Sequence, residues 1–239
     1  RLMRNYKKNQ ELLEKNHVYS KEMEHDACGV GLIASTEGKK SRQIVEYGIE
    51  ALKAVWHRGA VDADGKTGDG AGIHVEIPKD FFIEKIEVTG HKYDNAEICV
   101  GMIFLPRNDY ASQENCKTIV ESELTKNNFN IYGWRQVPVN PKVLGEKAFQ
   151  TMPEIIQVLF KSNNSDLLNK ELERKIYETR RKIENSAFNV SLNNFYICSM
   201  SSKSIIYKGM FLAEGISDFY LDLKDKRFVS RYAIFHQRF

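Results

Sequence analysis

The order of apolar and polar residues along this chain predicts a mixture of helices and strands. Three stretches, 41–56, 109–126 and 166–184, predict helices, and the first and third carry a clear apolar stripe. Short apolar or alternating runs predict strands at 29–35, 73–77, 98–105, 130–139, 155–160, 195–200, 204–208 and 228–239. A tight Ser-Ser-Lys turn between the strands at 195–200 and 204–208 predicts a hairpin. We therefore expect an α+β architecture with largely antiparallel sheets.

The pattern changes abruptly at Cys28. Residues 1–27 are polar with few scattered apolar side chains, so they can bury little and predict a weakly held arm or a removable segment. The run at 29–35 is compact, apolar and punctuated by glycines, which predicts a buried strand. We therefore divide the chain into an arm, 1–27, and one domain, 28–239.

Composition excludes several classes of protein. Apolar residues make up 42% and charged residues 28%, as in ordinary soluble globular proteins. The 35 basic and 32 acidic residues nearly balance, which argues against a nucleic-acid binder. No apolar run approaches the ~20 residues of a membrane span. Four widely spaced cysteines form no CxxC pair, so structural zinc is not expected, and Cys99 and Cys198 are predicted to be buried thiols.

Two glycine-rich patterns imitate nucleotide-binding motifs. Gly65-Lys66-Thr67 would need a glycine at position 60 to form a phosphate loop, and Ala60 stands there. A helix is predicted before this segment and a strand after it, whereas a phosphate loop needs the reverse order. The run from Gly68 to Gly72 fails the dinucleotide fingerprint for the same reason. We interpret its glycines as positions of positive φ and close backbone approach.

Several longer motifs resemble one family. They are His25–Gly31, Trp56–Ala60, Asp64–Ile73, Gly133–Val139, Tyr207–Met210 and His236–Phe239. In this order the chain resembles the glutaminase domain of glutamate synthase large subunits, a class II glutamine amidotransferase. The resemblance implies the N-terminal-nucleophile hydrolase fold, a four-layer α/β/β/α sandwich.

The resemblance makes Cys28 the catalytic nucleophile. Cleavage between Ala27 and Cys28 would free an α-amino group that titrates near ~8 and can accept the thiol proton at neutral pH. A peptide-bonded nitrogen cannot do this. Residues 1–27 would then be a propeptide, and Cys28 would be dormant until its removal.

Other site residues are also implied by the resemblance. Gly29 and Gly31 would let the backbone crowd the nucleophile and substrate, and Arg58 would help to order the site. Arg238 matches the arginine that holds the α-carboxylate of glutamine, a task that suits a planar guanidinium because it pairs with a carboxylate bidentately. No metal ligands are expected in this chain.

The family also implies a substrate and cofactors. The whole enzyme would hydrolyse L-glutamine and pass ammonia to 2-oxoglutarate at synthase domains of the same polypeptide. FMN and an iron–sulfur cluster are expected there, with electrons from a small NAD(P)H-oxidising subunit or from ferredoxin. No nucleic acid or membrane is expected as a partner, and the expected location is the cytoplasm, or a plastid in a photosynthetic eukaryote.

One departure from the family concerns the last residues. The sequence ends at Phe239, inside the motif that begins at His236. The Asn-Gly pair of the oxyanion hole and the acidic residue for the substrate amine do not occur in the 239 residues. We therefore expect an incomplete domain that is inactive and prone to aggregation by itself, since losing one oxyanion donor costs ~10²–10³ in rate.

Two alternatives remain open at this point. The first is another class II amidotransferase, acting in purine, amino-sugar or asparagine synthesis. The Trp134-Arg135 block and the long insert before Arg238 favour a glutamate synthase over it. The second is a non-catalytic relic or assembly module with the same fold.

Overall fold

The computed structural model describes residues 2–16, 29–167, 169–192 and 194–238, without the side chains of residues 2–4, 6 and 58. The α-helices are α1 Leu2–Asn16, α2 Arg42–Ala54, α3 Lys79–Val88, α4 Tyr110–Lys126, α5 Glu146–Gln150, α6 Asn169–Asn189 and α7 Ile216–Phe219. The strands are β1 Gly29–Ala34, β2 Thr67–Glu76, β3 Cys99–Leu105, β4 Phe129–Gln136, β5 Glu154–Ser162, β6 Tyr196–Ser201, β7 Ser204–Phe211 and β8 Tyr232–Gln237. Short 3₁₀ turns are η1 Trp56–Arg58, η2 Pro141–Val143, η3 Ala213–Gly215 and η4 Leu221–Lys224.

The first sheet has the strand order β1-β8-β2-β7, and every neighbouring pair is antiparallel. Helix α2 covers one face of it. The side chains of Val45, Ile49 and Leu52 recur on that side of the helix, as the sequence predicts, and all three are buried. The helix begins at Ser41, whose hydroxyl accepts a hydrogen bond from the Ile44 N–H.

β1 is a strand as expected, but one of its faces is exposed and the other is mostly half-buried. Val30 is 68% exposed and Leu32 is 60% exposed, so the prediction of a fully buried strand is wrong. β1 forms the edge of the first sheet, and α2 covers the opposite face. On the covered face Gly31 lies against Phe235, where a Cβ atom would come within 2.2 Å of the ring.

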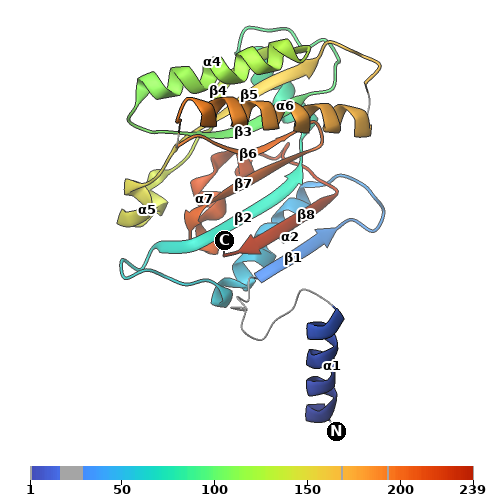
Figure 1. Ribbon diagram of the computed structural model, residues 1–239, viewed down its shortest axis with the longest axis vertical. Helices are drawn as coiled ribbons and strands as arrows, with labels where there is room; N and C mark the ends of the chain where they lie inside the picture. The colour runs from blue at the N-terminus through green and yellow to red at the C-terminus, as the bar shows by residue number, and fades with distance from the viewer. Residues whose placement is uncertain (1, 17–28, 168, 193, 239) are drawn as a thin grey trace.

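The second sheet has the order β4-β5-β3-β6 and is also antiparallel. Its elements follow one another in the chain as β3-α4-β4-β5-α6-β6, the split β-α-β arrangement of ferredoxin-like units. Helices α4 and α6 lie side by side over one face of this sheet (Figure 1). A hydrophobic cluster fills the space between the two helices and the sheet. It takes residues from both helices and from all four strands, including Val120, Phe160 and Ile176.

Two sheets with helices on their faces confirm the α+β architecture that the sequence predicts. The predicted hairpin at 195–208 needs a correction. Both strands exist, but β6 pairs with β3 in the second sheet and β7 pairs with β2 in the first. Side chains stabilise the turn between them, because the Glu173 carboxylate accepts hydrogen bonds from the Ser202 N–H at 2.7 Å and the Ser201 hydroxyl at 2.9 Å.

Helix α1 occupies part of the polar arm, where the sequence analysis expected no helix. Its described side chains are exposed or half-buried, and Figure 1 draws it apart from both sheets. Short helices α3, α5 and α7 were not expected either. None of the helices in the described ranges has the length and apolar character needed to cross a membrane.

A closed ring of four polar side chains joins the two sheets. Arg135 on β4 donates to both carboxylate oxygens of Asp222, at 2.8 and 2.9 Å, and to Gln157 Oε1 on β5 at 2.7 Å. Gln157 Nε2 donates to the Tyr207 hydroxyl on β7, which donates to Asp222 Oδ2 at 2.9 Å. The side chains of Arg135 and Asp222 are only 11% and 2% exposed. Each charge is therefore buried and depends on the other.

We predict that Asp222→Asn loosens the contact between the sheets. The substitution keeps the shape but leaves the Arg135 guanidinium buried without its counter-charge, which costs about 3–5 kcal/mol. Amide hydrogen exchange of peptides from β5 and β7, measured by mass spectrometry, should accelerate about a hundredfold or more. Asp218→Asn removes a carboxylate whose ion pair with Lys224 is exposed, and it should leave exchange unchanged. Equal protection in the Asp222 variant would contradict the role of the ring.

Candidate active site

The predicted site residues that the structure describes gather at one end of the first sheet. Gly29, the first residue of β1, pairs with Gln237 of β8. Gln237 in turn pairs with Ala71 of β2 on its other side. Three strands that are far apart in the sequence therefore bring Gly29 and Arg238 to the same sheet end, where Figure 1 marks the C-terminus.

A β-bulge in β2 shapes this end of the sheet. The pairing register of β2 with β7 shifts between Thr67 and Ala71. Gly70 lies within the bulge at φ +119°, a conformation that favours glycine. Its carbonyl oxygen accepts two hydrogen bonds. One comes from the Arg238 N–H just after β8, at 2.7 Å, and the other comes from Nε2 of Gln237, the last residue of β8, at 3.1 Å. The bulge thus anchors the residue predicted to bind the substrate carboxylate.

The glycine-rich run from Gly68 to Gly72 lies within a strand, whereas the sequence pattern predicted a strand only from residue 73. β2 begins at Thr67, six residues earlier than predicted. The predicted close approach is confirmed, because a Cβ on Gly68 would lie 2.6 Å from the Phe211 carbonyl oxygen and one on Gly72 would lie 2.3 Å from the His236 ring.

Arg238 itself is held in an unusual conformation. Its φ is +84°, which non-glycine residues rarely adopt. Its Nε lies 3.1 Å from Asp69 Oδ2, and its side chain is 35% exposed. Both Asp69 carboxylate oxygens are shielded from solvent and accept no aligned hydrogen bond from the described residues, so this contact is an ion pair. Strained residues of this kind concentrate at functional sites.

The segment after α2 approaches the same place. A Cβ on Gly59 would lie 2.2 Å from Gln237 Nε2 and 3.2 Å from Asp69 Oδ1. Arg58, the preceding residue, ends the 3₁₀ turn η1, so its backbone lies close to the site. The side chain of Arg58 is outside the described part of the structure, and its predicted supporting role stays a prediction.

Cys28, the predicted nucleophile, also lies outside the described residues. The other three cysteines of the sequence are described and buried. Burial raises the pKa of the Cys116 thiol to about 11 and that of Cys198 to about 12, and it raises the pKa of Cys99 well above its ordinary value. A nucleophilic cysteine needs a lowered pKa and partial exposure, so these three thiols are poor candidates.

Two cavities lie near this end of the molecule. One of about 410 Å³ has Asp69 in its wall, together with Val61, Lys147 and Met210. Its volume falls within the ~300–1,000 Å³ that is usual for small-molecule sites. Through Asp69, this cavity adjoins the end of β8.

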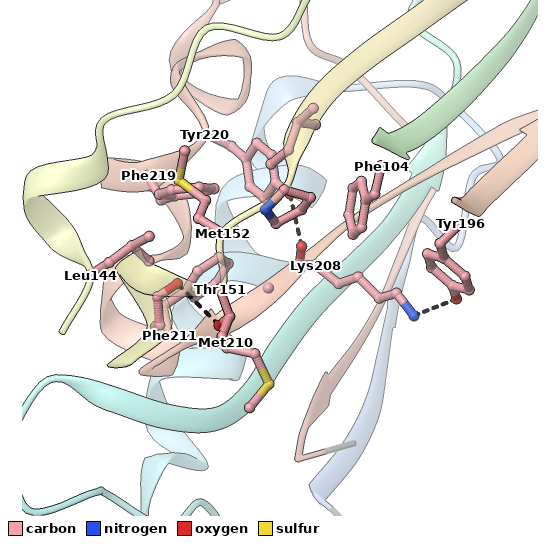
Figure 2. A pocket seen from close by; sticks show the side chains of 14 residues that line it. Phe104, Leu144, Thr151, Met152, Tyr196, Lys208, Met210, Phe211, Phe219 and Tyr220 are labelled. Atoms are coloured by element: carbon pink, nitrogen blue, oxygen red, sulfur yellow. Dashed lines mark hydrogen bonds between the residues drawn. The ribbon is translucent and has the colours of Figure 1, made fainter. Parts of the chain in front are cut away.

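The second cavity, of about 260 Å³, is lined mainly by aromatic and aliphatic side chains (Figure 2). Lys208 is the one Lys, Arg, Asp or Glu among the described residues that line it. Figure 2 shows its side chain pointing to Tyr196, whose hydroxyl accepts a hydrogen bond from Nζ at 2.7 Å. None of the predicted site residues lines this cavity, so we assign it no part in the chemistry.

Sequence reasoning predicted the positive φ of Gly70, but it missed the contacts that Asp69, Gly70 and Gln237 make at this end of the sheet. All three stand inside the motifs that carried the resemblance, next to residues that had been given a role. Gln237 lies 167 residues after Gly70 in the sequence, so only the pairing of β2 with β8 brings these residues together.

Comparison with known proteins identifies the family of this chain. The family model of class II glutamine amidotransferases matches residues 28–239, which is most of the chain. The chain belongs to this family. The match begins at Cys28 and includes every site residue named above.

Several curated proteins are similar over nearly the whole chain. The NADPH glutamate synthase large chain of Azospirillum brasilense is 53% identical over 234 residues, 98% of this chain and 15% of that protein. Ferredoxin-dependent glutamate synthase 1 of Arabidopsis thaliana is 39% identical over 218 residues, and the ferredoxin-dependent glutamate synthase of Pyropia yezoensis is 38% identical over 235 residues. These two alignments cover 90% and 95% of this chain. The chain spans about one seventh of the length of these relatives.

Proposed function

We propose that this chain is the glutaminase part of a glutamate synthase. In this proposal it hydrolyses the side-chain amide of L-glutamine to glutamate and ammonia, and the ammonia serves the reductive amination of 2-oxoglutarate elsewhere in the complete enzyme. The observation that carries the proposal is the 53% identity to a glutamate synthase large chain over 98% of this chain, within a family match that starts at Cys28.

The proposed chemistry uses the two groups of a single residue. The α-amino group of a processed Cys28 accepts the thiol proton, and the thiolate sulfur attacks the amide carbon of glutamine. The amide nitrogen takes the proton and leaves as ammonia, which gives a glutamyl thioester. Water then attacks the thioester carbon, releasing glutamate and restoring the thiol.

Arg238 is the proposed partner of the substrate α-carboxylate. Its backbone is tied to the Gly70 carbonyl and its Nε contacts Asp69, so the guanidinium is held at the end of β8 against β2. A guanidinium has five N–H donors and can meet a carboxylate with two of them in parallel. This geometry supports binding of an amino-acid carboxylate at the end of the sheet.

FMN, an iron–sulfur cluster and an electron donor belong to the proposal for the complete enzyme. The described residues contain no group of three or more His, Cys, Asp or Glu side chains placed to hold a metal ion. In the proposal the cluster and the flavin belong to synthase domains, as the resemblance to the family implies, and the electrons come from an NAD(P)H-oxidising subunit or ferredoxin.

The nucleophile is tested with Cys28→Ala in the complete enzyme. Glutamine-dependent glutamate formation should fall by at least about a thousandfold, because the attacking thiolate is lost. Ammonia-dependent glutamate formation should persist and shows that the variant is folded. Undiminished turnover with glutamine would refute the assignment of Cys28.

Processing is tested by N-terminal sequencing and intact-mass measurement of active enzyme. We expect the mature chain to begin at Cys28, because the base in the proposed mechanism is a free α-amine. An active glutaminase that retains residues 1–27 would rule out this mechanism.

The substrate clamp is tested with Arg238→Lys in the complete enzyme. Lysine keeps the charge but loses the paired planar donors, so the KM for glutamine should rise at least about tenfold, while the ammonia-dependent rate stays unchanged. An unchanged KM for glutamine would show that another residue binds the carboxylate.

A further inference from the structure

Asp69 is the charged group that lies against the Arg238 guanidinium from β2. The Nε–Oδ2 distance is 3.1 Å. The Asp69 side chain is 24% exposed as a whole, but both of its carboxylate oxygens are shielded from solvent. Removing a carboxylate from water is costly unless a counter-charge or hydrogen bonds compensate it. No hydrogen bond to Asp69 from the described residues does so, and Arg238 supplies the counter-charge.

The backbone around Asp69 is shaped to maintain this contact. Gly70, the next residue, accepts hydrogen bonds from the Arg238 N–H and from Gln237 Nε2. The bulge that contains both residues shifts the register of β2 and so sets the direction of the Asp69 side chain. Two consecutive residues of β2 thus hold Arg238: Gly70 binds its backbone N–H, and Asp69 contacts its side chain.

The contact with Asp69 and the proposed contact with the substrate differ in the nitrogens of the guanidinium that they use. A guanidinium carries one N–H on Nε and four on its two terminal nitrogens. The ion pair with Asp69 involves Nε, whereas a bidentate pair with a carboxylate can form along the edge made by the terminal nitrogens. In the proposed complex, Asp69 contacts Nε and the substrate carboxylate pairs with the terminal nitrogens.

We infer that Asp69 is a positioning residue for glutamine binding, fixing the plane of the Arg238 guanidinium before the substrate arrives. This inference rests on the proposed function, in which Arg238 binds the substrate α-carboxylate. Asp69 does not touch the reacting atoms. Its contribution is the orientation of a side chain that would otherwise sample several rotamers.

The experiment is done on the complete glutamate synthase with Asp69→Asn, which keeps the size of the side chain and removes its charge. The KM for glutamine should rise about tenfold, because the ion pair to a charged group is weakened. The kcat at saturating glutamine and the ammonia-dependent rate should stay within about twofold. Glutamine affinity measured by calorimetry in a Cys28→Ala background should fall by the same factor as the KM rises.

A double-variant cycle distinguishes positioning from a merely structural role. If Asp69 acts through Arg238, Asp69→Asn should raise the KM much less in an Arg238→Lys background than in the wild type. Asp218→Asn, which removes an exposed carboxylate paired with Lys224, serves as the matched control and should leave the KM unchanged.

Three results would overturn the inference. The first is an unchanged KM in Asp69→Asn, and the second is an effect that adds fully to that of Arg238→Lys. The third is a lower KM, which would mean that Asp69 competes with the substrate carboxylate. If Cys28→Ala stays active or Arg238→Lys leaves the KM unchanged, the proposed function fails instead, so the two failures can be told apart.

Discussion

The buried pair of Arg135 and Asp222 is the constraint on which the arrangement of the two sheets depends. Two opposite charges lie in the interior, and each would be strongly destabilising without the other. The Arg135 guanidinium also donates to Gln157 on β5, and the Asp222 carboxylate accepts from Tyr207 on β7. Such a network has few alternative geometries, so it fixes where β7 lies relative to the second sheet. β2 pairs with β7, and through β2 this constraint extends to the site.

β2 connects that constraint to the chemistry. Its central and C-terminal part is an ordinary buried strand, with Ile73 and Val75 in the core. Its first part is a glycine-rich bulge, where small residues let Phe211 and His236 approach closely. The same strand therefore serves as a packed element at one end and as an anchor for Arg238 at the other. A side chain at Gly68 would meet the backbone of Phe211 and push β2 away from β7, whereas one at Gly72 would displace the His236 ring.

Much of this fold could be predicted from local pattern. Helix α2, Arg42–Ala54, shows its cap at Ser41 and its apolar stripe, and the strand around Ile103 is an unbroken apolar run. The pairing of strands could not be predicted, because periodicity does not identify a partner. The assumed hairpin at 195–208 is the clearest example, since its strands pair in different sheets. The ion pair of Asp69 with Arg238 could not be predicted for the same reason, because it depends on the pairing of β2 with β8.

The two sheets also differ in the distance along the chain over which their strands find one another. The four strands of the second sheet all come from the continuous segment 99–201. In the first sheet, by contrast, Gly29 pairs with Gln237, which lies about 200 residues later. Closing so long a loop costs conformational entropy before the contacts that it allows can form. During synthesis the N-terminal part of the chain is made first, so residues 99–201 are available before β8. We therefore expect the ferredoxin-like unit to fold during synthesis, with the first sheet closing on it afterwards. In this order of events, the region that carries the chemistry is the last to acquire its shape.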